Sequence, residues 1–197
     1  MLFANVSNNE LSIMNVWGYI MGYAIVGYFD KTSDEKIRTL WKALADIGVD
    51  DYLTNSENNP HIKFAMFNSI NLLSAQNELL LLSKRLEKIK IHFKKYGIYP
   101  SDKPFLTIDI ADNNEILKLH IEIQNIFNKF YEADARGYFD IGIWKPDCQL
   151  TVSFDKSKLA TAMDYLVDTS MPFNGKLEKI GLIEYHPAKQ LFTYPLC

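Results

Sequence analysis

The sequence has little of what marks several classes of protein. Of its 197 residues only Cys148 and Cys197 are cysteines, and their spacing is not that of a structural zinc site, so we expect a protein of a reducing compartment, the cytoplasm. No stretch approaches the roughly 20 apolar residues that a membrane-spanning helix needs. The N-terminal region also lacks a basic leader followed by a small-residue cleavage site. We therefore expect neither a membrane anchor nor a secretion signal.

An excess of either charge is also missing. Lysine and arginine number 21 against 24 aspartates and glutamates, a net charge of −3, so a contact with nucleic acid has to come from a local group of residues. The basic run between Lys84 and Lys95 could supply such a contact, although a solvated strand edge is the commoner reason for lysines in this pattern. The hydrophobic fraction of 48% predicts an ordered globular fold.

Hydrophobic periodicity predicts strands and helices that alternate along the chain. A closing hairpin and the alternation of apolar with polar residues favour antiparallel pairing. We therefore predict the α+β class with two similar lobes, in which residues 21–197 form one bilobal domain and residues 1–20 an N-terminal extension. The expected strands are 23–29, 61–67, 88–94, 104–110, 147–154, 177–185 and 190–194, and the expected helices are 32–47, 74–86, 112–130 and 156–168.

Two of the expected strands begin alike. Residues 60–64 read PHIKF and residues 146–150 read PDCQL, so each starts with a proline and a polar residue and then alternates. Side chains two residues apart share one face of a strand. His61 therefore lies on the same face as Lys63 in the first strand, and Asp147 on the same face as Gln149 in the second.

Taken in order along the chain, these strands and their neighbours resemble a known family. GYAIVGYFD, LWKAL, PHIKFAMF, PFLTIDI, LKLHIEIQNIF, WKPDCQLTV and IGLIEYHPAKQLFTYPL are similar to the two-histidine phosphoesterases, in particular to the branch of 2′–5′ RNA ligase-like proteins and RNA cyclic phosphodiesterases. The resemblance spans residues 22–197. It implies two lobes with antiparallel-dominated sheets, helices outside and a central cleft, and one strand with His-x-Thr or His-x-Ser in each lobe.

In that family one imidazole takes a proton from water and the other gives one to the leaving oxygen, while the hydroxyl residues hold phosphate oxygens. His61 matches the first histidine. Lys63, Asp147 and Gln149 replace the first hydroxyl residue, the second histidine and the second hydroxyl residue. The resemblance thus implies His61 and Asp147 as catalytic residues and Lys63 and Gln149 as phosphate or substrate ligands. Trp144 could stack on a base or plug the junction of the lobes.

These replacements leave several hypotheses about function. The first is a divergent RNA 2′,3′-cyclic phosphodiesterase or 2′–5′ RNA ligase-like enzyme with weak or lost activity, which acts on RNA ends or cyclic nucleotides by acid–base chemistry without metal or cofactor. The rival is a non-catalytic protein that binds a nucleotide, an RNA end or a protein in the same cleft, with Asp147 paired to His61 or Lys63. A third is an interaction scaffold. His61 favours the enzyme, and Lys63 favours the binding protein.

Overall fold

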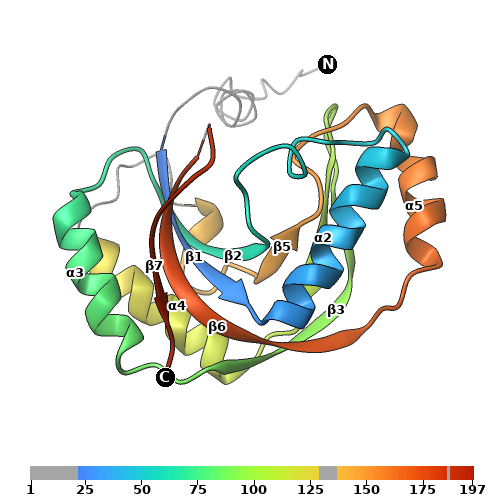
Figure 1. The fold of residues 1–197 in the computed structure, drawn as a ribbon. Helices are drawn as coiled ribbons and strands as arrows, with labels where there is room; N and C mark the ends of the chain where they lie inside the picture. The colour runs from blue at the N-terminus through green and yellow to red at the C-terminus, as the bar shows by residue number, and fades with distance from the viewer. Residues whose placement is uncertain (1–21, 129–136, 186) are drawn as a thin grey trace, which may run out of the picture.

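The computed structural model describes residues 22–128, 137–185 and 187–197 (Figure 1). The N-terminal extension expected at residues 1–20 lies outside these ranges. The strands are β1 (Gly22–Phe29), β2 (His61–Phe67), β3 (Ile89–Tyr99), β4 (Phe105–Ile110), β5 (Asp147–Gln149), β6 (Phe173–Tyr185) and β7 (Lys189–Pro195). The helices are α2 (Lys31–Asp46), α3 (Leu72–Ser83), α4 (Asn114–Phe127) and α5 (Leu159–Val167), with 3-10 turns η3 (Gly137–Phe139) and η4 (Lys156–Lys158).

The described strands form one antiparallel sheet in the order β1-β2-β5-β4-β3-β6-β7, and β6 also pairs with β1, which closes the first six strands into a ring. Strand β6 is long enough to serve both halves: residues 173–177 pair with β3 and residues 177–185 with β1. Figure 1 shows α3 and α4 on the side of β1 and β7, and α2 and α5 on the side of β3. The α+β class is therefore confirmed, and the two lobes are halves of a single curved sheet.

The two halves also meet where β2 pairs with β5. Ile62 lies opposite Cys148 in an antiparallel pair, and both side chains are buried. Since side chains alternate along a strand, His61, Lys63, Asp147 and Gln149 all project from the other face of the sheet. The two similar strands of the sequence are thus direct neighbours.

The helices bury apolar stripes against the sheet, and their starts show which residues act as caps. Helix α2 begins after Asp30, whose carboxylate accepts from the Ser33 amide at 3.0 Å, so the helix starts at Lys31, one residue before the expected start. Helix α3 begins after Asn71, whose side chain accepts from the Ser74 amide at 2.9 Å. None of the helices within the described ranges has the length and apolar character needed to cross a bilayer.

Strand β5 ends at Gln149, five residues before the expected end of the strand at residue 154. Beyond it, a few backbone bonds to Leu106 and Pro104 remain, and side chains take up other amides. The Thr151 hydroxyl accepts from the Leu106 amide at 2.8 Å, and the Asp50 carboxylate accepts from the amides of Val152 and Ser153 at 2.5 and 3.3 Å. The chain can therefore leave the sheet without leaving these amides unpaired.

The Thr151 hydroxyl supports a stability prediction. Thr151→Val keeps the shape of this fully buried side chain but leaves the Leu106 amide without its acceptor. We expect the free energy of unfolding to fall by about 1–3 kcal/mol. Urea denaturation measures it, with Thr161→Val on the exposed surface of α5 as the control, expected to change stability by less than about 0.5 kcal/mol. Equal effects of the two substitutions would contradict this role.

Candidate functional site

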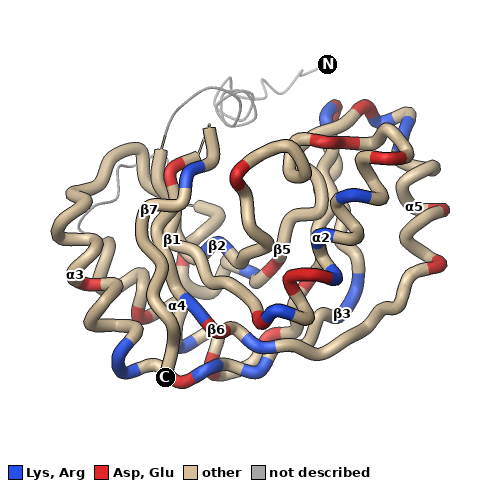
Figure 2. Tube along the Cα trace, in the orientation of Figure 1, with Lys and Arg blue, Asp and Glu red and all other residues tan. Residues whose placement is uncertain are grey.

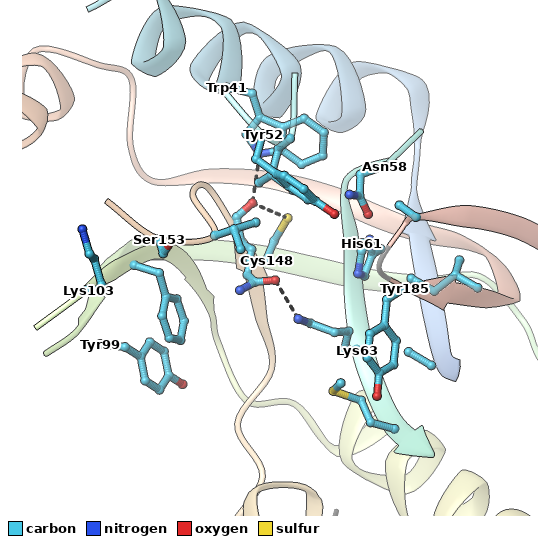
Figure 3. A pocket seen from close by; sticks show the side chains of 18 of the residues that line it. Trp41, Tyr52, Asn58, His61, Lys63, Tyr99, Lys103, Cys148, Ser153 and Tyr185 are labelled. Carbon is cyan, nitrogen blue, oxygen red and sulfur yellow. Dashed lines mark hydrogen bonds between the residues drawn. The ribbon is translucent and has the colours of Figure 1, made fainter. Parts of the chain in front are cut away.

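A cavity of about 600 Å³ lies over the pairing of β2 with β5 (Figure 3). Charged and polar side chains enter it from the two strands, and aromatic side chains form much of its wall. The lining includes His61, Lys63, Cys148 and Gln149 from the strands, the aromatic residues Trp41, Tyr52, Tyr99, Phe105 and Tyr185, and the polar residues Asn58, Ser101, Lys103 and Ser153.

The imidazole of His61 is held in one protonation form. Its Nδ1 lies 2.7 Å from the backbone oxygen of Asn59. Because a carbonyl oxygen only accepts, Nδ1 carries the hydrogen, and Nε2 keeps its lone pair. Burial and then the nearby charge of Lys63 lower the pKa of His61 to about 4, against the smaller raising effect of the Asn59 contact. At neutral pH His61 is therefore a neutral base.

Lys63 places a cation beside that base. Its Nζ donates to Oε1 of Gln149 across the two strands at 2.6 Å. Burial lowers the pKa of Lys63, while the charge of Asp147 acts in the opposite direction and favours the ammonium form. The lysine and the glutamine thus form a polar pair on the wall of the cavity, two residues along β2 from the imidazole.

Asp147 lies on the same face but is covered by tyrosines. The hydroxyls of Tyr99 and Tyr138 each donate to Oδ2 of Asp147 at 3.2 Å, and the two hydroxyls also contact each other. Burial raises the pKa of Asp147, and Lys63 and the two hydroxyl groups oppose that rise. Burial and the negative charge of Asp147 raise the pKa of Tyr99 to about 12, so the phenol keeps its proton at neutral pH.

Asp147 lines a second hollow of about 490 Å³, together with Asp109 and Lys145. It does not line the cavity that contains His61. Tyr99 lines both spaces, and its hydroxyl contacts Asp147. The paired strands therefore bring His61, Lys63 and Gln149 together in the cavity and hold Asp147 beside it.

Of the two roles expected for Trp144 from the sequence, its position fits the plug better than stacking on a base. Its side chain is only 3% exposed and stacks on the ring of His120, with ring centroids 4.1 Å apart. Its Nε1 donates to the backbone oxygen of Lys63 at 2.9 Å. The indole is thus part of the core and supports β2 from behind, because its faces are already covered and it does not line the cavity. His120 in turn lies 3.0 Å from the Phe139 backbone oxygen.

The basic run that begins at Lys84 lies at the end of α3 and along β3, where acidic residues face several of its members. Figure 2 shows basic and acidic residues interleaved in this part of the chain. This mixture fits a solvated surface better than a site for polyanions. The ion pairs join Arg85 to Glu122, Lys88 to Glu178 and Lys95 to Asp109.

Sequence reasoning missed the aromatic wall of the cavity. Trp41 is one of the buried residues of α2, yet its Nε1 donates to the backbone oxygen of Gln149 at 2.9 Å. Tyr99 and Phe105 stack at 4.4 Å between ring centroids, at an interplanar angle of 9°. They flank the turn between β3 and β4, and an aromatic residue at each end of a short turn is the one signal that could have suggested such a pair. Among the described residues, no three His, Cys, Asp or Glu side chains are grouped as metal ligands.

No protein-family model matches the sequence, and no curated protein does. Solved structures match it along most of its length. TT0787 of Thermus thermophilus has a TM-score of 0.59 at 10% identity, with 89% of this chain and 97% of that chain covered. LigT of E. coli with 3′-AMP has a TM-score of 0.56 at 10% identity, with 89% and 98% covered. Usb1 of Kluyveromyces marxianus has a TM-score of 0.50 at 10% identity, with 90% and 98% covered.

The chain has the fold of the two-histidine phosphoesterases. This confirms the resemblance seen in the sequence at the level of the fold. Because identity is only 10–13%, the residues of the cavity have to be judged on their own chemistry. LigT has also been solved with ATP and with NADP+, so that protein accommodates several nucleotides.

The effect of Lys63 on His61 is directly measurable. In Lys63→Met the positive charge is gone while burial remains, so we expect the pKa of His61 to rise above about 4 without reaching the roughly 6.5 of a free histidine. An NMR titration of the imidazole measures this. Lys103→Met, also in the cavity wall, is the control and should leave the pKa unchanged. A His61 pKa that stays the same or falls in Lys63→Met would contradict the electrostatic account.

Proposed function

We propose that the chain binds RNA ends or cyclic nucleotides in this cavity and hydrolyses 2′,3′-cyclic phosphodiesters slowly, with His61 as its acid–base group. The observation that supports this most is the pairing of a neutral imidazole with a lysine cation in the wall of one cavity. A phosphodiester carries one negative charge, so the ammonium of Lys63 supplies the attraction. The imidazole supplies the base.

The proposed reaction uses the groups in order. Nε2 of His61 takes a proton from a water molecule while the oxygen of that water forms a bond to phosphorus. The bond from phosphorus to the 2′ or the 3′ oxygen of the ribose breaks, and Lys63 and the amide of Gln149 hold the charged phosphate oxygens. The leaving oxygen takes a proton from solvent. Asp147 stands where the family has its second histidine, and its carboxylate accepts hydrogen bonds from two tyrosines instead of donating a proton. A missing general acid makes the reaction slow.

We assign Asp147 an electrostatic role in this proposal. A lysine that is buried without an anion loses its proton readily. The negative charge of Asp147 counteracts the effect of burial on the pKa of Lys63, so the carboxylate favours the ammonium form. It does so from outside the cavity, where it does not repel the phosphate directly. The aromatic wall, with Tyr52 and Phe105, provides surfaces on which a base can stack.

A non-catalytic binding protein is the second candidate, and one observation favours it. The hydroxyls of Tyr99 and Tyr138, which contact Asp147, also contact each other. A closed polar cluster therefore stands where the family has its second catalytic histidine. Such a protein would bind nucleotides through Lys63 and release them unchanged. LigT, with this fold, has been solved with 3′-AMP and with ATP, which makes nucleotides the first ligands to test for either candidate.

Binding is tested by calorimetry with 2′,3′-cyclic AMP. We expect Lys63→Ala to weaken binding by about tenfold or more, the loss of one charge-assisted hydrogen bond, and we expect added salt to weaken wild-type binding. The matched control is Lys94→Ala, in the neighbouring hollow, with affinity as in wild type. Equal affinities of wild type and Lys63→Ala, or no binding by wild type, would remove Lys63 from the site.

Hydrolysis is tested by the pH dependence of turnover of the same compound. The base must be unprotonated, and the pKa of His61 is about 4. Activity should therefore rise with pH through about 4 and be constant from about pH 5 to 7, instead of rising through the usual value of roughly 6.5 for histidine. His61→Gln should lower the rate by about 10²–10⁴-fold. A wild-type rate equal to that of His61→Gln would favour the binding protein over the enzyme.

A further inference from the structure

The tautomer of the His61 imidazole depends on a backbone atom outside the strand. The carbonyl of Asn59 fixes the hydrogen on Nδ1, and Asn59 belongs to the long loop between α2 and β2. Pro60 follows it and restricts the backbone of Asn59 to extended conformations. This restriction limits the orientation of the carbonyl, but it does not by itself hold the loop against the imidazole.

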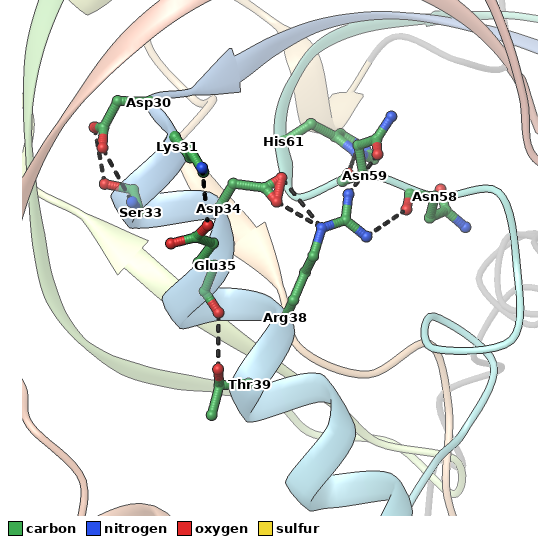
Figure 4. Close-up of polar contacts among 10 residues, drawn as sticks. All are labelled: Asp30, Lys31, Ser33, Asp34, Glu35, Arg38, Thr39, Asn58, Asn59 and His61. Carbon is green, nitrogen blue, oxygen red and sulfur yellow. Dashed lines mark hydrogen bonds and ion pairs between the residues drawn. The ribbon is translucent and has the colours of Figure 1, made fainter.

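Arg38 of helix α2 provides that contact (Figure 4). Its Nη2 donates to the side-chain oxygen Oδ1 of Asn59, and its Nη1 lies 3.5 Å from the backbone oxygen of Asn58. One planar guanidinium therefore grips two consecutive residues of the loop. These two residues immediately precede Pro60 and the imidazole.

The guanidinium is itself held from the helix. Its Nε lies 2.6 and 3.3 Å from the two carboxylate oxygens of Asp34, one turn earlier in α2, and it lies over the ring of Trp41, 5.8 Å from the ring centroid. Arg38 thus has a carboxylate on one side, the loop on the other and an indole beneath it. A rigid helix is in this way connected to the loop that carries the Asn59 carbonyl.

We infer that Arg38 is a positioning residue for His61: through Asn58 and Asn59 it holds the carbonyl that keeps the hydrogen on Nδ1 and leaves Nε2 as the base. Asp34 aligns Arg38 for this task. Only the effect on turnover rests on the proposed function. The effect on the imidazole follows from the contacts alone and holds for a binding protein as well.

A second ion pair of the same helix provides a comparison. Lys42 and Asp46 form an i,i+4 pair at 2.7 Å on the exposed surface of α2, as Arg38 and Asp34 do at 2.6 Å. The contacts of Lys42 join two residues of one helix, whereas the Arg38 side chain reaches both asparagines of the loop before β2. Lys42→Ala is therefore a matched control for the loss of a helix ion pair.

The test measures the tautomer of His61 by NMR in protein labelled with ¹⁵N at histidine, with the signals assigned through His61→Gln. Wild type should show the hydrogen on Nδ1. In Arg38→Ala the ratio of the Nδ1-H to the Nε2-H form should fall about fivefold, the factor that one hydrogen bond of ordinary net strength supplies. Arg38→Lys, which keeps the charge but not the planar fork, should recover part of the ratio.

Asp34→Asn should shift the ratio in the same direction as Arg38→Ala, and the double variant should add little, because both act through one guanidinium. Lys42→Ala should leave the tautomer as in wild type.

If wild type hydrolyses cyclic nucleotides, Arg38→Ala should lower kcat more than it raises KM. If wild type has no activity, the proposed reaction fails, while the tautomer still decides the role of Arg38. A tautomer ratio in Arg38→Ala equal to that in wild type or Lys42→Ala would overturn the inference.

Discussion

The pairing of β2 with β5 is the constraint on which the cavity depends, because it alone brings the two similar strands of the sequence side by side. Two tryptophans hold this pairing from different parts of the chain. The indole of Trp41 donates to the backbone oxygen of Gln149, and the indole of Trp144 donates to that of Lys63. A slip of one residue would turn the polar side chains into the core and break both bonds. The register is therefore specified by buried donors as well as by the alternation of the strands.

The site built on this pairing is asymmetric, although the fold that carries it has two similar halves. On β2, a neutral imidazole at position 61 lies near the cation of Lys63. On β5, Asp147 is withdrawn behind Tyr99 and Tyr138 and acts through its charge. The pKa values of the three ionisable groups depend on one another: the lysine helps to keep the imidazole neutral, and the aspartate helps to keep the lysine charged. Substitution of any one of these residues alone therefore changes the pKa of its neighbour.

Much of this arrangement could be predicted from the sequence, and the failures have a common physical origin. The expected strand at 61–67 has the observed bounds, because a proline precedes it and its side chains alternate. The expected end of β5 is wrong, since beyond Gln149 the Asp50 carboxylate accepts from the amides of Val152 and Ser153, and the Thr151 hydroxyl accepts from the Leu106 amide of β4. Of the two roles expected for Trp144, a plug fits its position better than stacking on a base, because its stacking partner is His120, which is distant in the sequence. Local patterns specify the elements, whereas contacts between distant side chains decide which residues reach the cavity.

The proposed phosphate site consists of His61 and Lys63 together. A crystal structure with 3′-AMP bound tests it most directly, because the position of one phosphate group decides it. We expect phosphate oxygens within hydrogen-bond distance, about 2.7–3.2 Å, of both Nε2 of His61 and Nζ of Lys63, with the base against the aromatic wall. A phosphate bound in the hollow beside Asp147, or outside the cavity altogether, would contradict it.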